Sequence, residues 1–161
     1  MLKDYIYFRL PTKEDISRTG ERIQPFIHRT PIMQSSTLNQ IAGCELFFKC
    51  ENLQKAGAFK SRGAVNAVLS LDKYDLQKGV CTHSSGNHAQ ALARAAALMK
   101  TPAHIVMPEN APEVKVEAVR SYGGKITFCK PTLEARESTL ARVKEETGAI
   151  ETHPYDNLKV I

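Results

Sequence analysis

A single lysine stands at a position where an amine could act as a nucleophile. Lys60 lies where a polar loop gives way to a helix-like run over residues 59–71. The positive end of a helix dipole disfavours a cation, so a lysine held there should offer more neutral amine for attack on a carbonyl group. The common alternative is a lysine whose flexible side chain simply reaches water.

A second polar segment, Ser84-Ser85-Gly86-Asn87-His88, leaves a predicted strand and enters an alanine-rich run. In parallel sheets, ligands gather where strand ends meet helix N-termini, and the free N–H groups there favour an anion. The segment therefore suits a phosphate or a substrate carboxylate. Alternatively, Ser85 or Asn87 only caps the helix and Gly86 relieves the turn. Spacing alone does not separate these two interpretations.

Several other chemistries do not fit the sequence. It has no G-x-S-x-G nucleophile elbow, no G-K-[ST] phosphate loop and no G-x-G-x-x-G fingerprint. His83 and His88 are five residues apart, which is not the i, i+4 spacing that places two zinc ligands on one helical face. The four cysteines form no C-x-x-C pair, so we expect buried free thiols and no metal site.

Length and composition predict an ordinary globular protein. The chain has 161 residues, of which 42% are hydrophobic, and this is enough for one domain with a core. The net charge of +5 is spread along the chain without aromatic interleaving, which argues against nucleic-acid binding. No segment resembles a signal peptide or a membrane span, so a cytoplasmic protein is expected.

The elements that position these segments alternate between helix and strand. A series of this kind, with glycines at the joints, predicts an α/β fold in which helices cover both faces of a parallel sheet. Helices are expected over 13–24, 36–41, 59–71, 88–99, 112–122 and 132–146, and strands over 46–48, 79–83, 103–107, 125–129 and 149–152.

The two chemical segments, taken together, resemble a known family. The stretches AFKSRGA at 58–64 and SSGNHA at 84–89 are similar to those of fold type II pyridoxal-phosphate enzymes, in the serine racemase and threonine dehydratase group. HRTP at 28–31, FFKCE at 47–51 and HPY at 153–155 match in register, so the likeness covers nearly the whole chain. It implies a three-layer small domain over 53–150, an incomplete large domain over 1–52, and the start of a return to that domain over 151–161.

The resemblance implies a role for each site residue. Lys60 would hold pyridoxal phosphate covalently and then move the substrate α-proton on one cofactor face. Phe59 would pack beside the ring, and Asn87 would hydrogen-bond its 3′ oxygen. The substrate carboxylate would be held by the loop residues Ser84, Ser85, Gly86, Asn87 and His88.

Within this group, Ser85 favours racemisation. Returning a proton on the opposite cofactor face requires a second acid/base, and the resemblance gives that role to this serine. The expected activity is serine racemase with serine or threonine dehydratase activity, and the alternative is an L-threonine dehydratase. The likeness further implies a homodimer, and possible Mg and ATP binding mostly through residues outside this chain. The nucleotide candidates within it are Ser35, Ser36, Lys55 and Tyr122.

The resemblance also implies parts that the 161 residues do not contain. These are the glycine-rich loop for the cofactor phosphate, the residue opposite the pyridine nitrogen and the carboxylates of a divalent-cation site. We therefore expect the chain alone to hold cofactor poorly and to associate through exposed apolar surface. Two further hypotheses stay open: a non-catalytic fragment or interaction module of this fold, and a nucleotide-binding α/β domain.

Overall fold

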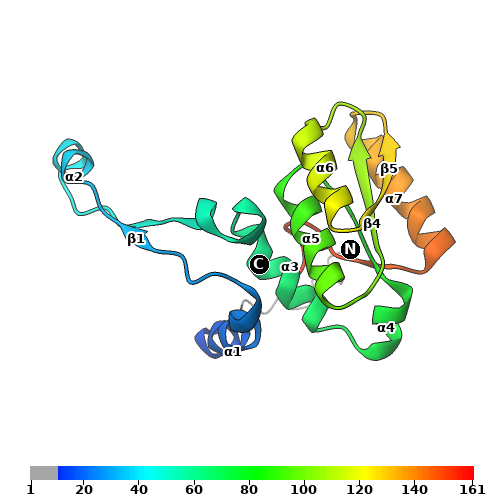
Figure 1. The fold of residues 1–161 in the computed structure, drawn as a ribbon, viewed down its shortest axis with the longest axis horizontal. Coiled ribbons are helices and arrows are strands. Elements are labelled where there is room, and N and C mark those ends of the chain that lie inside the picture. The colour runs from blue at the N-terminus through cyan, green and yellow to red at the C-terminus, as the bar shows by residue number, and fades with distance from the viewer. Residues whose placement is uncertain (1–10) are drawn as a thin grey trace, which may run out of the picture.

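A four-stranded parallel sheet forms the centre of the molecule (Figure 1). The computed structural model describes residues 11–161, so the first ten residues of the predicted N-terminal part lie outside it. The strand order is β5-β4-β3-β6, and every neighbouring pair is parallel. The strands are β3 (Val80–His83), β4 (Ala103–Pro108), β5 (Lys125–Cys129) and β6 (Ile150–Glu151).

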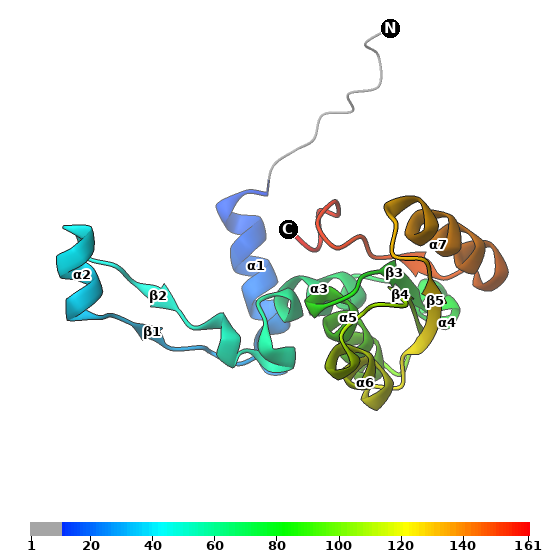
Figure 2. The ribbon, with the colours of Figure 1, turned by 90° about the horizontal axis from the view of Figure 1, so that it is seen from above.

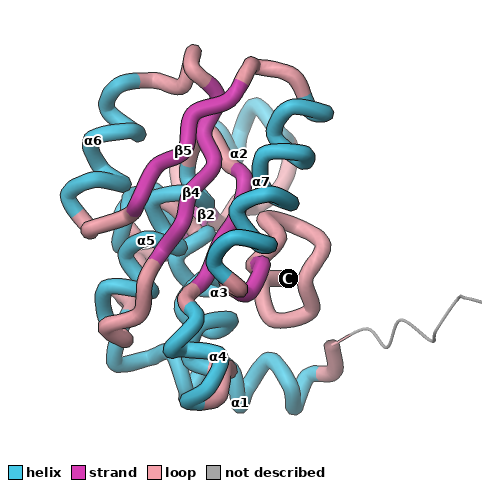
Figure 3. Tube along the Cα trace, turned by 90° about the vertical axis from the view of Figure 1, so that its right-hand side faces the viewer, coloured by secondary structure: helices cyan, strands magenta, loops and turns pink. Residues whose placement is uncertain are grey.

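Helices cover both faces of this sheet, which gives three layers (Figure 3). On one face lie α5 (Asn87–Leu98) and α6 (Glu113–Ser121), with α3 (Lys60–Leu69) packed against α5. The other face is covered by α7 (Leu133–Thr147). The predicted three-layer α/β fold is confirmed.

The sheet divides the core into two parts because successive strand residues point to opposite faces. Ile105 and Met107 of β4 pack with the α5 residues, whereas Val106 between them packs with α7. The alanines of α5 are almost completely buried, as Ala89, Ala93 and their neighbours show. Small side chains let this helix lie close to the sheet and to α3.

The N-terminal part projects from this body as an arm, residues 31–50 (Figure 2). It contains a two-stranded antiparallel ribbon, β1 (Ile32–Met33) and β2 (Phe48–Lys49), and the helix α2 (Ser36–Ala42) at its tip. Among residues 11–161 no third strand joins the ribbon. The predicted exposure of apolar side chains is confirmed for the arm at Ile32, Met33, Leu38, Ile41, Phe47 and Phe48.

Some local elements differ from the sequence prediction. The helix predicted over 59–71 ends at Leu69, because Asp72 accepts a hydrogen bond from the Asp75 backbone and starts a separate helix, α4 (Lys73–Lys78). The strand β1 was also not predicted. The first helix, α1 (Lys13–Ile23), begins with a capping box formed by Thr12 and Asp15. Short 3₁₀ turns complete the elements: η1 (Gln24–Phe26), η2 (Glu51–Leu53) and η3 (Lys55–Gly57).

None of the helices described between residues 11 and 161 is both long and apolar enough to cross a membrane.

Candidate active site

Lys60 is the first residue of α3, at the helix terminus where the sequence predicted it. No side chain among the described residues caps this terminus at Phe59. The Lys60 Nζ donates a hydrogen bond of 2.5 Å to the carbonyl oxygen of Pro154, which follows β6. The Phe59 ring is exposed, and its centroid lies 5.1 Å from the same Nζ. The amine therefore lies at the carboxyl end of the sheet.

The predicted anion loop connects β3 to α5 and begins against the neighbouring strand. The Ser84 backbone N–H donates to the Val106 carbonyl at 3.0 Å, and the Gly86 N–H donates to the Ser84 hydroxyl at 3.3 Å. Gly86 is the N-cap of α5, and no side chain in the described part of the chain caps that helix. The alternative interpretation, in which Ser85 or Asn87 caps it, is therefore wrong. The terminal N–H groups of α5 remain available to a ligand.

His88 is buried at the start of α5 and is held through one ring nitrogen. Its Nε2 lies 2.9 Å from the carbonyl oxygen of Thr152. Because a carbonyl only accepts, Nε2 must carry the proton, which leaves Nδ1 as an acceptor. This Nδ1 is buried and has no hydrogen-bond partner among the described residues. Burial lowers the pKa of His88 to about 4, and the charge of Lys60 adds to this effect, so the ring is neutral near pH 7.

A single stretch of chain joins the two chemical segments. We call residues 152–155 the return segment, since they carry the chain from β6 back toward α3. The Pro154 carbonyl of this segment accepts a hydrogen bond from Lys60, and the Thr152 carbonyl accepts one from His88. The ring of His153 packs edge-on against that of His83, with centroids 5.7 Å apart, and burial lowers the pKa of His83. The tertiary structure therefore joins Lys60 and His88, which ends the predicted anion loop, to the same short segment of chain.

Asn87 is exposed and is oriented by a residue that the sequence analysis did not single out. Lys115 of α6 donates from its Nζ to the Asn87 Oδ1 at 2.8 Å. An ammonium group only donates, so the amide oxygen must face it. The amide nitrogen then remains free to donate to an acceptor in the site. Neither residue is close to the other in sequence, and no local pattern predicts the pair.

The four nucleotide candidates lie on separate parts of this chain. Ser35 caps α2 by accepting from the Leu38 N–H at 3.4 Å, and Ser36 begins that helix at the tip of the arm (Figure 1). Lys55 begins η3 near the base of the arm, and Tyr122 follows α6 on the body. One copy of the chain does not bring the four together, so a shared nucleotide site stays a prediction.

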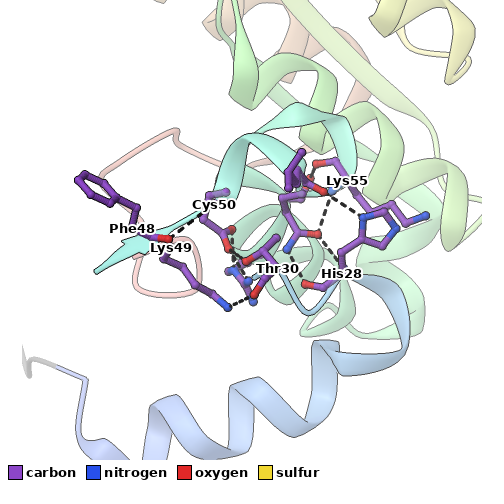
Figure 4. A network of polar contacts seen from close by, with 11 residues as sticks. His28, Thr30, Phe48, Lys49, Cys50 and Lys55 are labelled. Carbon is purple, nitrogen blue, oxygen red and sulfur yellow. Dashed lines mark hydrogen bonds and ion pairs between the residues drawn. The ribbon is translucent and has the colours of Figure 1, made fainter. Parts of the chain in front are cut away.

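A polar network at the base of the arm was also missed from the sequence (Figure 4). The Arg62 guanidinium donates to both oxygens of Glu51, at 2.6 and 2.9 Å. The Thr30 hydroxyl donates to the same carboxylate at 2.6 Å. Hydrogen bonds from Arg62 are the main cause that lowers the pKa of Glu51 to about 2, against the opposing effect of burial. Glu51 belongs to η2 and Arg62 to α3, so no periodicity within one element would reveal the pair.

The cysteine interpretation is only half right. Cys81 and Cys129 are buried thiols, and burial raises the pKa of Cys81 to about 12. Cys44 is exposed and Cys50 is half-buried, because both belong to the projecting arm. Among residues 11–161 no group of three or more His, Cys, Asp or Glu side chains could hold a metal ion.

The donor set around Lys60 suits an aromatic aldehyde cofactor. A primary amine can bind the aldehyde, an aromatic ring at 57% exposure can stack, and an oriented amide can donate to a ring oxygen. By contrast, a cavity of about 480 Å³ lies between α1, Asn66 of α3 and the last residues of the chain, and none of the predicted site residues lines it. The chemical groups therefore gather at the carboxyl end of the sheet.

Comparisons with known proteins agree with this geometry. Residues 23–161 match the model of a family described as pyridoxal-phosphate dependent enzyme. The chain is 52% identical over 150 residues to a serine racemase of Dictyostelium discoideum, covering 93% of this chain and 46% of the relative. It is 53% identical over 152 residues to a beta-hydroxyaspartate dehydratase of Paracoccus denitrificans, covering 94% and 48%.

A solved structure of maize serine racemase superposes with a TM-score of 0.88 at 51% identity, covering 91% of this chain and 45% of that one. The chain thus spans about half the length of the curated relatives it matches. Family match, sequence identity and three-layer parallel-sheet architecture all agree, and the chain belongs to the pyridoxal-phosphate dependent enzymes of fold type II.

Proposed function

We propose that this chain carries the catalytic lysine of a pyridoxal-phosphate enzyme that acts on serine or a related hydroxy amino acid. Lys60 is the residue that binds the cofactor covalently. The observation that carries this proposal is the return segment, whose carbonyls contact both the Lys60 amine and the His88 ring. An amine and an anion-binding loop at one strand end are the two features that an amino-acid substrate needs.

Each residue of the candidate site has its own part in the proposed reaction. When bound, pyridoxal phosphate draws electrons from the α-carbon of an amino acid, so that its proton can leave. Lys60 removes or returns that proton on one face of the cofactor. The N–H groups at the start of α5, together with Ser84 and the neutral His88, hold the substrate carboxylate. Lys115 holds the amide oxygen of Asn87, so the amide N–H of Asn87 would be free to hold the ring oxygen of the cofactor.

Ser85 decides between two activities. Racemisation requires a second acid/base opposite Lys60, and a half-buried serine in this loop supplies a hydroxyl for that task. A dehydratase, which eliminates water from a hydroxy amino acid, needs no such group. The second candidate function is that of a dehydratase without racemase activity. It is supported by the Paracoccus dehydratase, which is as similar to this chain as the Dictyostelium racemase is. We propose a racemase that also eliminates water.

Nucleotide binding, Mg binding and a homodimer belong to the same proposal. Ser35 and Ser36 lie on the arm and Tyr122 on the body, so a nucleotide that contacts all three requires a second copy of the chain. Crosslinking with a photoreactive ATP analogue tests this directly. Labelled peptides from both the arm and the α6 end would support a site between copies, and labelling of neither would contradict it.

The first experiment tests the lysine. The purified chain is mixed with pyridoxal phosphate, reduced with borohydride and digested, and the modified peptide is identified by mass spectrometry. We expect an adduct on Lys60 and no adduct there in Lys60→Ala. An exposed lysine such as Lys73 provides the background level of labelling. Absence of a Lys60 adduct above this background would contradict the proposal and favour a non-catalytic fragment.

The second experiment separates the two activities. L-serine is incubated with the chain in a large excess of pyridoxal phosphate, and D-serine and pyruvate are both measured. Ser85→Ala should abolish D-serine formation and leave pyruvate formation within about threefold, because elimination can proceed through Lys60 alone. Equal loss of both products would show that Ser85 only holds the loop. Ser84→Ala, which removes a hydroxyl assigned to the substrate carboxylate, should instead lower both products together.

A further inference from the structure

The first turn of α3 is held by side chains other than a helix cap. The Ser61 hydroxyl is fully buried and donates to the carbonyl of Lys55. Arg62 reaches Glu51 with two N–H groups, Nη2 to Oε1 at 2.6 Å and Nε to Oε2 at 2.9 Å. Lys60 precedes these two anchors by one and two residues. The direction in which the Lys60 side chain points therefore depends on contacts made by the two residues that follow it.

The loop before this turn is conformationally unusual. Ala56 has φ +54° and Gly57 has φ +64°, so two successive residues adopt left-handed backbone. An alanine in this region is strained by roughly 1 kcal/mol, and such residues persist only where surrounding contacts fix them. Gln90 of α5 provides one such contact, donating to the Ala56 carbonyl at 2.5 Å. The loop by itself cannot fix where the helix begins, so the anchors after Lys60 are needed.

Glu51 also connects this turn to the arm. The carboxylate accepts from Thr30, which is 3% exposed and lies just before the arm, while Glu51 itself follows the arm directly. Lys49 donates to the Thr30 carbonyl at 2.6 Å, and the Cys50 N–H donates to the Pro31 carbonyl at 3.0 Å. Figure 4 shows Thr30, Lys49 and Cys50 meeting at this base. One carboxylate thus ties both ends of the arm to the helix that bears Lys60.

We propose that the bidentate Glu51–Arg62 pair is a positioning element for Lys60, which sets the first turn of α3 so that the amine faces the Ser84–His88 loop. The inference rests on the proposed role of Lys60. A planar guanidinium bound through two N–H groups fixes an orientation, which a lysine at the same position cannot do. The pair is half-buried, with 33% exposure for Arg62 and 19% for Glu51, so water competes with it less than with a surface pair.

The test uses two variants and two probes of Lys60. Arg62→Lys keeps the positive charge and removes the planar guanidinium with its two N–H donors. Glu51→Gln keeps the side-chain shape and removes the negative charge. The first probe is pyridoxal phosphate trapped with borohydride, for which we expect labelling of Lys60 to slow at least fivefold in both variants. The second probe is formaldehyde with borohydride, which methylates any accessible amine. A Lys60 released from the Pro154 carbonyl should be methylated at least threefold faster.

Slower labelling of Lys60 by pyridoxal phosphate together with faster methylation of Lys60 identifies a positioning role for the pair. A purely structural defect would speed methylation of many lysines and disturb the circular dichroism spectrum, whereas mispositioning should affect Lys60 alone. The matched control is the exposed Arg120–Glu117 pair of α6, separated by 2.5 Å, where Arg120→Lys should change neither rate. Should the Glu51 and Arg62 variants fold poorly, Thr30→Val removes one hydrogen bond to the carboxylate and should slow cofactor labelling about twofold.

The outcomes separate this inference from the proposed function. If wild-type Lys60 is labelled by pyridoxal phosphate and both variants match it within twofold, the positioning role is overturned. If wild-type Lys60 takes no cofactor label, the proposed function fails, and the methylation rates alone then decide the positioning role. Unchanged methylation in both variants would overturn it in that case too.

Discussion

Acid should weaken the fold through one carboxylate, Glu51. Its pKa is lowered from an ordinary 4.5 to about 2, mainly by hydrogen bonds from Arg62. A group whose pKa is depressed by folding stabilises the folded state above its unfolded pKa, and this contribution is lost as pH falls through the folded pKa. The stabilisation should therefore be complete above about pH 5 and should disappear between about pH 4.5 and 2.

The magnitude follows from the shift. A depression of roughly 2.5 pKa units corresponds to about 3 kcal/mol, since one unit is about 1.4 kcal/mol. Arg62 is one-third exposed, so solvent screening reduces the expected contribution to about 1–2 kcal/mol. Glu51→Gln removes the charge and keeps the shape, so its free energy of unfolding should lie below that of wild type by this amount at pH 7. At pH 2, close to the folded pKa, about half of the Glu51 side chains are protonated and resemble glutamine, so most of the difference should be lost.

Urea unfolding monitored by circular dichroism at pH 7, 5, 3.5 and 2 measures this difference. The matched control is Glu146→Gln, because Glu146 pairs with Arg142 at 3.1 Å and both side chains are more than half exposed. That control should change stability very little at any pH. A Glu51→Gln deficit that stayed constant from pH 7 to pH 2 would refute the reasoning, since it would arise from packing rather than from ionisation.

Three further changes have definite expected results. Replacing the strained Ala56 by glycine at φ +54° should raise the free energy of unfolding by about 0.5 kcal/mol, as measured by urea titration. Gly63→Ala would place a Cβ 2.3 Å from the Val160 carbonyl oxygen, so it should displace the last residues of the chain and speed their amide hydrogen exchange. Lys115→Met should free the amide of Asn87 to rotate and weaken capture of pyridoxal phosphate two- to fivefold, as followed by its visible absorbance; unchanged capture would show that the 2.8 Å bond does not orient the amide.

The sequence by itself determined the fold class, and it nominated the residues of the candidate site. Short apolar strands between helices are a local pattern, so the parallel three-layer fold was predictable. Lys60 and the Ser84–His88 loop were nominated in the same way, because a helix start and a strand-to-helix loop are defined by neighbouring residues. The role of each residue came from the family resemblance and stays a prediction. Boundaries were less certain: the helix predicted to 71 stops at Leu69, where Asp72 competes as a new cap.

The tertiary structure decided which groups these residues meet. Lys60 and Pro154 are 94 residues apart, and His88 and Thr152 are 64 apart, yet each pair is joined by a hydrogen bond. Such contacts depend on the path of the whole sheet, since β6 must lie beside β3 before the return segment can reach α3. Periodicity and capping act over a few residues, so they nominate the amine of Lys60 but do not reveal the carbonyl that accepts its hydrogen bond.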